Sequence, residues 1–246
     1  MRRAVLELVG VASAAAERPL HDLDLTVGEG DAVVVLGLPG AGKTSLVRLV
    51  AGLDEVSGGE LRLFGEEVAK LPFSMARALR DRVAVVFERG GIWANRTVAE
   101  NLVLPMAYRL NRPVASLASS DRLAELLAAL GLTGVDARTT ASLDDSERRR
   151  VLLVRALFTE PEILLFDEPQ SALSRAHQRD IAALLERERR LRALSILFTD
   201  NDGRIDPYEA DRPVVMHDRR IVPGAVRLPE RALAEMNRET TRETSP

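Results

Sequence analysis

The chain has 246 residues, which at about 150 residues per domain is enough for one or two domains with a sizeable buried core. Hydrophobic residues make up 46% and charged residues 29%, and the net charge is −3, so the composition is that of a globular protein and does not indicate a nucleic-acid binder. The sequence has no cysteine and no apolar run of the roughly 18 residues that a membrane-spanning helix needs, which excludes disulfides, cysteine-ligated metal and such a helix.

The first part of the chain is predicted to be rich in β-strands. The basic start and the small residues up to Ala16 could be read as a signal peptide, but Glu7 interrupts the apolar stretch and favours an edge strand at 4–9. Apolar and β-branched runs predict further strands at 20–27, 31–36, 60–64 and 82–87.

A glycine-rich loop follows the strand predicted at 31–36. It has the spacing G-x-x-x-x-G-K-T and precedes a helical pattern, so successive backbone N–H groups are expected to point into one concavity at a helix N-terminus, where a polyphosphate binds. Lys43 would reach the β and γ phosphates, and the hydroxyl of Thr44 would hold Mg²⁺. The alternative is a tight turn without a ligand. The predicted binding residues are Gly37, Leu38, Pro39, Gly40, Ala41, Gly42, Lys43, Thr44 and Ser45.

A helical region is predicted between residues 90 and 158, with helices at 98–110, 121–130 and 147–158. The apolar run at 163–166 then ends in Asp167 and Glu168, which a buried strand would deliver to the carboxyl edge of an open α/β sheet, where ligands bind. Asp167 is the predicted Mg²⁺ ligand and Glu168 the general base that polarises the attacking water. The alternative is an acidic turn that caps the strand.

The last part of the chain is predicted to return to the sheet. A charged helix is expected from Ser174 to about Arg190, followed by strands near 194–198 and 213–222. A short helix at 230–236 and a polar end at 237–246 complete the pattern.

With these motifs in place, the chain resembles the nucleotide-binding subunits of the ATP-binding cassette (ABC) transporters. The likeness extends over nearly the whole chain and includes segments outside the two nucleotide motifs, namely 57–60, 83–87, 155–157, 160–162 and 214–222. It implies an α/β fold, a P-loop NTPase core of ABC type with an antiparallel β subdomain and an α-helical subdomain. Residues 1–246 would form a single nucleotide-binding domain, with the RecA-like core and β subdomain at 1–89 and 159–222, the helical subdomain at 90–158 and a C-terminal tail at 223–246.

The resemblance also implies cofactors and partners. ATP and Mg²⁺ would be bound, and the partners would be a transmembrane permease subunit and a second ABC subunit, identical or not, with the chain cytoplasmic and peripheral on the inner face of the cell membrane. The segment from Arg89 to Arg96 lies where members of the family form a groove that receives the membrane domain, so Ile92 and Trp93 are candidate contacts. The alternative is that Trp93 packs within its own domain, as an isolated tryptophan often does. Segments 88–93 and 101–105, with Phe166, look somewhat like the Mla and Mce lipid-transport ATPases.

Several positions depart from the family pattern. Glu88 replaces a glutamine; it can still ligate Mg²⁺ but cannot donate a hydrogen bond, and it could also be a solvated strand end. The signature segment is Leu143-Asp144-Asp145-Ser146-Glu147, which lacks both glycines of the family pattern. Its acidic side chains would be brought towards a triphosphate, and two unit charges about 4 Å apart repel by roughly 4 kcal/mol at an effective dielectric constant near 20. Asp144 and Glu147 could instead form a capping box, and Asp145 or Ser146 could also cap the helix. Asp200 occupies the switch-histidine position, where it cannot donate to a phosphate, and an acidic loop cap is the alternative.

A further departure is that residues 11–16 lack the aromatic side chain on which the family stacks adenine, so base selectivity should be low. These changes lead to the expectation of an ATP-binding ABC transporter subunit with slow or partner-dependent hydrolysis. A non-hydrolysing nucleotide-sensing or structural cassette and a soluble ABC-type assembly protein remain as alternatives.

Overall fold

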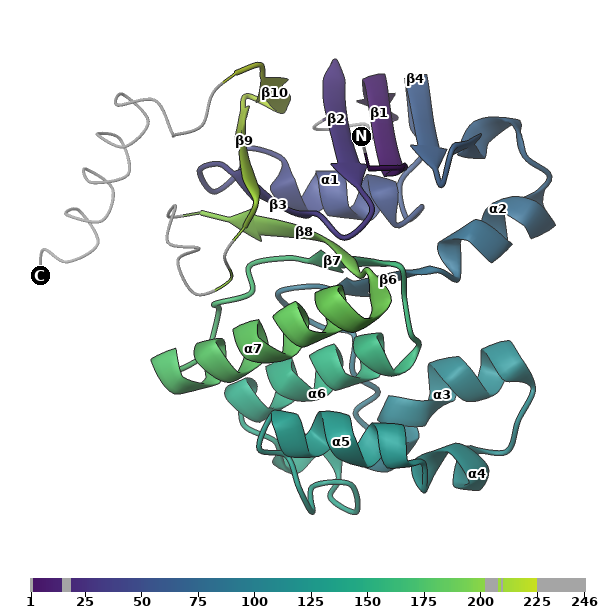
Figure 1. Cartoon of the computed structure of the whole chain (residues 1–246), viewed down its shortest axis with the longest axis vertical. Helices are drawn as coiled ribbons and strands as arrows, with labels where there is room; N and C mark the ends of the chain where they lie inside the picture. Colours follow the sequence, from purple (N-terminus) through teal and green to yellow (C-terminus); the bar gives the residue numbers. More distant parts are fainter. Residues whose placement is uncertain (1, 15–18, 202–207, 209, 225–246) are drawn as a thin grey trace, which may run out of the picture.

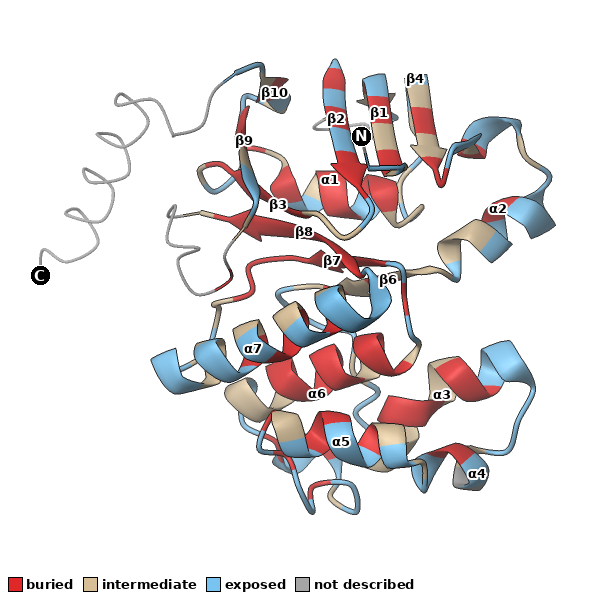
Figure 2. Ribbon diagram, in the orientation of Figure 1, coloured by how far each residue is buried: buried red, intermediate tan, exposed pale blue. Residues whose placement is uncertain are grey.

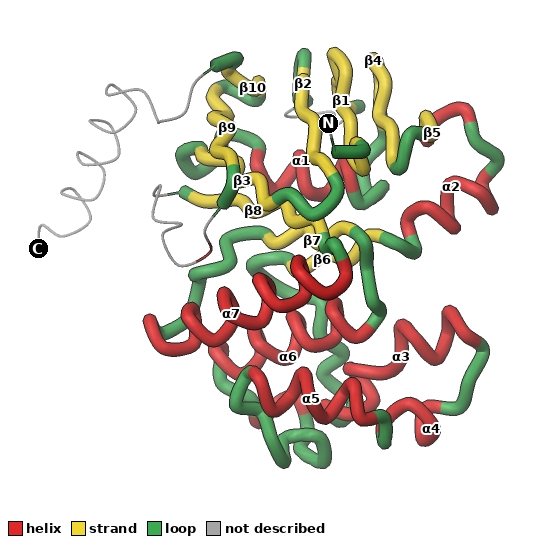
Figure 3. The backbone as a smooth tube through the Cα atoms, viewed as in Figure 1, coloured by secondary structure: helices red, strands yellow, loops and turns green. Residues whose placement is uncertain are grey.

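Two sheets and a set of helices build the structure, a computed structural model that describes residues 2–14, 19–201, 208 and 210–224 (Figure 1). The helix predicted at 230–236 and the polar end predicted at 237–246 lie outside these residues. Strands and helices alternate along much of the chain (Figure 3), and the predicted α/β class is confirmed. The division into core, helical subdomain and tail stays a prediction.

The larger sheet has six strands in the order β10-β9-β3-β8-β7-β6. All neighbours pair in parallel except β9 and β10, which form an antiparallel hairpin. Every residue of β3, β7 and β8 is buried, as expected for parallel strands covered on both faces. The bounds are β3 (Ala32–Leu36), β6 (Val83–Val86), β7 (Ile163–Phe166), β8 (Ser195–Asp200), β9 (Arg212–His217) and β10 (Arg220–Val222).

The smaller sheet is antiparallel, with the order β2-β1-β4-β5. Its strands are β1 (Ala4–Ser13), β2 (Leu23–Gly28), β4 (Val56–Leu63) and β5 (Glu66–Glu67). The prediction of an edge strand at 4–9 is wrong, because β1 pairs with β2 on one side and with β4 on the other. Its two neighbours come from later parts of the chain, and the local hydrophobic pattern carries no information about them.

Helices surround the larger sheet, and two of them were not predicted, the amphipathic α2 and the short α4. The predicted helices at 98–110 and 121–130 are present as α3 and α5, and the one predicted from Ser174 is α7, which Ser174 caps. No helix among the described residues is both long and apolar enough to cross a bilayer. The bounds are α1 (Lys43–Val50), α2 (Phe73–Arg80), α3 (Val98–Leu110), α4 (Val114–Ala118), α5 (Asp121–Ala129), α6 (Asp145–Phe158) and α7 (Arg175–Arg192), with 3₁₀ helices at Val68–Lys70 and Thr140–Ser142.

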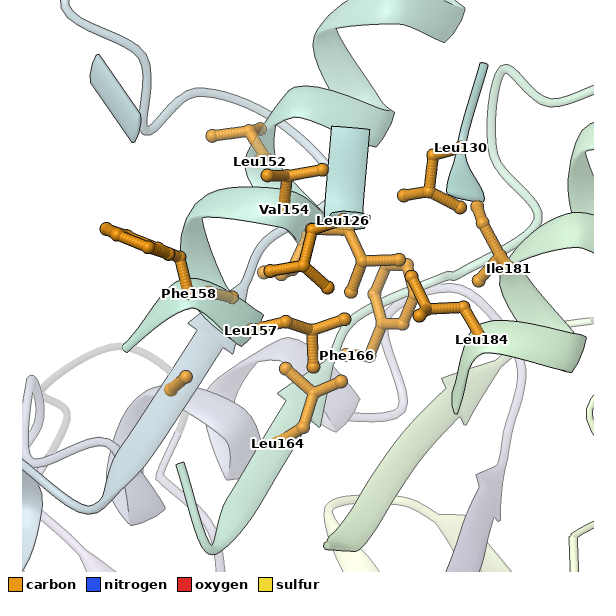
Figure 4. Close-up of a cluster of buried hydrophobic side chains, with 14 of the residues drawn as sticks. Leu126, Leu130, Leu152, Val154, Leu157, Phe158, Leu164, Phe166, Ile181 and Leu184 are labelled. Carbon is orange, nitrogen blue, oxygen red and sulfur yellow. The ribbon is translucent and has the colours of Figure 1, made fainter. Parts of the chain in front are cut away.

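The six-stranded sheet separates two hydrophobic cores. Alternate residues of each strand point to opposite faces, so Val33 and Val35 pack with α1 and the smaller sheet, while Val34 and Leu36 belong to the core with the helices below. The second core, in which Leu126 of α5, Leu157 of α6 and Leu184 of α7 meet Phe166 of β7, is drawn in Figure 4. Buried residues accordingly concentrate in the sheet and on the inward faces of its helices (Figure 2). The carboxyl ends of β3, β6, β7 and β8 are thereby fixed along one edge of the sheet.

Candidate functional site

The glycine-rich loop connects β3 to α1 at that edge. Gly40 (φ 82°) and Gly42 (φ 104°) have left-handed backbone conformations, which side-chain-bearing residues rarely adopt. A Cβ on Gly42 would lie 2.8 Å from Leu20 Cδ2, and one on Gly37 would lie 2.7 Å from the carbonyl oxygen of Met216. The glycines therefore let the loop curl at the N-terminus of α1 while the backbone packs closely on its neighbours.

Lys43 crosses the inside of this loop. Its side chain is 5% exposed, and Nζ donates to the carbonyl oxygens of Gly37 (2.7 Å) and Leu38 (3.2 Å) and to Asn201 Oδ1 (2.5 Å). Burial lowers the pKa of Lys43, and the negative charges of Glu168 and Asp167 oppose this shift. The ammonium group is thus held inside the loop, and its Nζ lies 3.6 Å from Glu168 Oε1.

Asp167 follows β7 directly and is 1% exposed. Thr44 Oγ1 donates to its Oδ2 (2.9 Å) and Thr199 Oγ1 donates to its Oδ1 (2.6 Å), and Thr199 Oγ1 also accepts from the backbone N–H of Glu168 (2.9 Å). The structure therefore brings two of the three predicted metal ligands, Thr44 and Asp167, into direct contact. Thr199 was missed in the sequence, where it is a strand residue with no distinguishing pattern.

Glu168 has a left-handed backbone conformation (φ 49°), which is uncommon for a residue with a side chain. Burial raises the pKa of its carboxyl group to about 7; Lys43 opposes this shift, while the negative charges of Asp200 and Asp167 add to it. The backbone N–H of Asn201 donates to Oε2 at 3.3 Å. A carboxylate in this state can take up a proton near neutral pH, as a general base requires.

Arg149 ties α6 to the strand ends, and the sequence did not single it out. It is 3% exposed; Nη2 donates to the carbonyl oxygens of Glu168 (2.7 Å) and Asp167, and Nη1 donates to that of Phe87. Burial lowers the pKa of Arg149 to about 10, and nearby carboxylates, Asp167 first, oppose the shift. The guanidinium group remains charged at neutral pH and joins the ends of β6 and β7 to one helix.

A cavity of about 370 Å³ opens over the loop. It brings most of the predicted site residues together, while Gly37, Leu38 and Ala41 belong to the loop behind it and Asp167 lies behind Thr44. Two of the lining residues, Asn201 and Arg219, were missed in the sequence because they lie far from the motifs along the chain. The lining residues are Pro39, Gly40, Gly42, Lys43, Thr44, Ser45, Glu88, Glu168, Asn201 and Arg219.

The positions that depart from the family pattern have defined surroundings. Glu88 Oε1 accepts a hydrogen bond from Ser171 Oγ (3.3 Å) and also lines the cavity. Asp200 is fully buried at the end of β8, where Gln170 Nε2 donates to its Oδ1. The parallel pairing of β8 with β3 continues as far as Asp200, and the alternative of an acidic loop cap stays a prediction.

The signature segment starts α6 through a capping box. Glu147 N–H donates to Asp144 Oδ1 (2.7 Å), and Asp144 N–H donates to Glu147 Oε2 (3.1 Å), so the prediction that these two residues cap the helix is confirmed. The helix starts two residues earlier than predicted. Ser146 Oγ lies 2.9 Å from His177 Nδ1, which links the start of α6 to the first turn of α7.

Trp93 lies away from this site and is 46% exposed. The guanidinium carbon of Arg155 lies 5.4 Å from the centre of its ring, and the tryptophan lines a cavity of about 560 Å³ together with Leu104, Pro105 and Tyr108. The expectation of a contact with a partner at Ile92 and Trp93 stays a prediction.

Comparison with known proteins places these observations in a wider context. The family profile described as "ABC transporter" matches residues 20–171. The methionine import ATP-binding protein MetN of Xanthomonas campestris pv. campestris strain 8004 is 36% identical over 203 residues, and that of Caulobacter vibrioides is 35% identical over 208 residues. These matches cover 82% and 84% of the chain but only 60% and 62% of the relatives, so the chain spans about 60% of their length.

Solved structures show the same fold. The dimeric structure of MJ0796, described as a bacterial ABC transporter cassette, matches with a TM-score of 0.80 at 21% identity and covers 91% of the chain and 100% of that cassette. The structure of cbiO1 from Clostridium perfringens, part of the ABC transporter complex cbiONQ, matches with a TM-score of 0.77 at 20% identity and covers 98% and 94%. The likeness to the Mla and Mce ATPases stays a prediction.

Proposed function

The chain belongs to the ABC transporter family, and from this premise we propose that it is an ATP-binding subunit that binds Mg-ATP and couples it to a membrane partner, with slow or partner-dependent hydrolysis. In this proposal it acts as a single nucleotide-binding domain on the inner face of the cell membrane, with a permease subunit and a second ABC subunit as partners. The observation that carries the proposal is the cavity in which Lys43, Thr44 and Glu168 meet over the glycine-rich loop.

The residues at the cavity fit a polyphosphate. The loop presents its backbone to the cavity at the N-terminus of α1, where partial positive charge favours an anion, and the ammonium group of Lys43 lies within the same loop. Mg²⁺ is commonly held by one or two carboxylates together with phosphate oxygens, and Asp167 beside Thr44 is such a carboxylate.

Oxygen donors for the ion are present in the cavity lining and directly behind it. Thr44 and Asp167 would hold it, and Glu88 lies where it could add a carboxylate oxygen. Bound Mg²⁺ would neutralise the charge that develops on the transferred phosphate. Glu168 would accept the proton of the attacking water, and Thr199 and Arg149 hold its backbone in place for that role.

Two features support slow hydrolysis. Asp200 stands where a histidine would donate to the γ-phosphate, and its buried carboxylate accepts from Gln170 instead. In the family dimer the signature segment closes over the partner's nucleotide, and here that segment presents Asp145, which is 89% exposed at its side chain. Carboxylates brought towards a triphosphate oppose closure by Coulomb repulsion.

The same features favour a second candidate, a cassette that binds nucleotide without hydrolysing it and acts as a sensor or structural subunit. The retained Glu168 argues for hydrolysis and the buried Asp200 against it. A soluble assembly protein of ABC type is a third candidate, and copurification of the chain with a membrane protein would distinguish it from the other two.

One titration tests the first two candidates. Binding of Mg-ATP and release of phosphate would be measured on the purified chain, with Lys43→Ala and Glu168→Gln as variants. The proposal expects Lys43→Ala to lose binding and Glu168→Gln to keep binding but lose turnover. Binding without turnover in the unmodified chain would favour the sensor, and absence of binding would refute both candidates.

A further inference from the structure

We propose that Arg219 is a second cationic ligand of the polyphosphate in the cavity over the glycine-rich loop. The inference rests on the proposed function, because it assumes that this cavity takes a nucleotide. Arg219 is more than 170 residues away from the loop in sequence, in the turn between β9 and β10, and no nucleotide-binding motif includes it.

The backbone of Arg219 is fixed against the loop. Its N–H donates to the carbonyl oxygen of Ala41 (3.1 Å), and its carbonyl oxygen accepts from the N–H of His21 (3.2 Å). The side chain reaches along the same loop, where Nη2 donates to the carbonyl oxygen of Gly40 at 3.4 Å, and Arg219 lines the cavity that also contains Lys43. Arg219 therefore lies at the cavity, and the two backbone hydrogen bonds fix its main chain beside the loop.

The turn that carries Arg219 is strained. Asp218 (φ 43°) and Arg219 (φ 63°) are consecutive residues in the left-handed region of the hairpin turn, where Asn-Gly or Gly-Gly pairs are usual because glycine has no Cβ to clash. A residue with a long side chain is thus present at a position that glycine would occupy at lower energy. Strain of this kind concentrates at ligand sites, and here it accompanies a cation that faces a cavity.

The charges of the residues that line the cavity indicate why a second cation would favour binding of a polyphosphate. The charged lining residues are Lys43 and Arg219 against Glu88 and Glu168, and the ammonium group of Lys43 is already shared among two carbonyl oxygens, Asn201 and Glu168. Without Arg219 the lining formed by the described residues would carry more negative than positive charge, which disfavours a highly charged anion. The planar guanidinium group of arginine can donate two parallel hydrogen bonds to phosphate oxygens.

The experiment measures Mg-ATP, Mg-GTP and inorganic triphosphate binding by calorimetry for the unmodified chain and for Arg219→Gly. Thermal unfolding is recorded alongside. We expect affinity for all three ligands to fall by about 10-fold or more. The variant without ligand should unfold about 2–4 °C higher, because glycine relieves the turn strain.

Three further variants make the result specific. Asp218→Gly relieves strain in the same turn without touching the cavity lining, and Arg220→Gln removes a positive charge from the same hairpin, where Arg220 pairs with Asp22 at 2.6 Å; both should bind as the unmodified chain does. Arg219→Lys should retain part of the affinity because it keeps the charge.

The outcomes separate this inference from the function on which it rests. If the unmodified chain binds ATP and Lys43→Ala does not, but Arg219→Gly binds all three ligands normally, the proposed function stands and the Arg219 inference is overturned. A loss confined to ATP and GTP, with triphosphate binding unchanged, would mean that Arg219 contacts the base or ribose, and it also overturns the inference. If the unmodified chain binds none of the ligands, both proposals fail.

Discussion

At the scale of single residues, Thr199 organises the acidic end of the site. Its hydroxyl donates to Asp167 Oδ1 and accepts from the N–H of Glu168, so one buried oxygen fixes a carboxylate and the backbone of the next residue. Asp167 in turn accepts from Thr44 at the start of α1. The three elements β7, β8 and α1 therefore meet through a chain of hydrogen bonds in which each donor has a defined acceptor.

Replacing Thr199 with valine removes this hydroxyl while keeping the shape of the side chain. We expect the free energy of unfolding to fall by about 2 kcal/mol, because a buried carboxylate oxygen and a buried N–H group lose their common partner. Urea titration measures the change, and Thr199→Ser is the matched control because it keeps the hydroxyl. An equal loss in both variants would show that packing, and not the hydrogen bonds, is responsible.

At the scale of secondary-structure elements, the start of α6 is stabilised by charge. Arg138 Nη1 donates to Glu147 Oε1 (2.7 Å), and Glu147 is also the reciprocal partner in the capping box with Asp144. The hydrogen bond from Arg138 contributes most to holding the pKa of Glu147 below its ordinary value of 4.5, followed among the favourable interactions by the N–H of Asp144, while desolvation opposes the shift. In this chain the signature segment therefore caps the helix that it begins.

Glu147→Gln should therefore destabilise the fold in a pH-dependent way. A depressed pKa contributes stability that is fully present above the unfolded pKa and is lost as pH falls through the folded value. We expect the variant to be about 1 kcal/mol less stable at pH 7, with the difference from the unmodified chain shrinking below about pH 4.5. Chemical unfolding at pH 7 and at pH 3.5 measures it; a difference that is the same at both values would contradict the ionic origin.

The elements also show what the sequence can predict. The glycine-rich loop, the strand before Asp167 and the capping box were predictable because each depends on neighbours within a few residues. The position of β1, the extension of β8 to Asp200 and the contacts of Arg149, Thr199 and Arg219 were not, because their partners lie on other elements. Short α2 and α4 were missed for another reason: with eight and five residues, they give too few turns for a clear periodicity.

At the scale of the whole molecule, Arg149 joins the helices below the large sheet to the strand ends that carry the site. It belongs to α6, and its guanidinium group contacts the carbonyl oxygens after β6 and β7. The signature segment, which forms the start of the same helix, is thus connected to Glu168 through one buried side chain. A movement of α6 relative to the sheet would change the surroundings of Glu168 directly.

Arg149→Met should loosen this connection while filling much of the same space. We expect hydrogen exchange to become faster in residues 87–92, 144–150 and 167–169 and to stay unchanged in the four-stranded sheet. The reason is that the carbonyl oxygens that lose a buried donor lie only at the ends of β6 and β7, next to α6. Arg148→Met is the control, since Arg148 is only partly buried and makes a weaker 3.3 Å contact with the carbonyl oxygen of Leu143. Uniformly faster exchange throughout the protein would point to global destabilisation instead.

The pairing of β3 sets the order in which a newly synthesised chain can fold. The strand that leads into the glycine-rich loop is made more than 150 residues before its two neighbours, β8 and β9. Until then both edges of β3 lack their native partners, and exposed apolar edges pair readily with other chains. A chain truncated before residue 217 would therefore carry the glycine-rich loop without a completed sheet behind it.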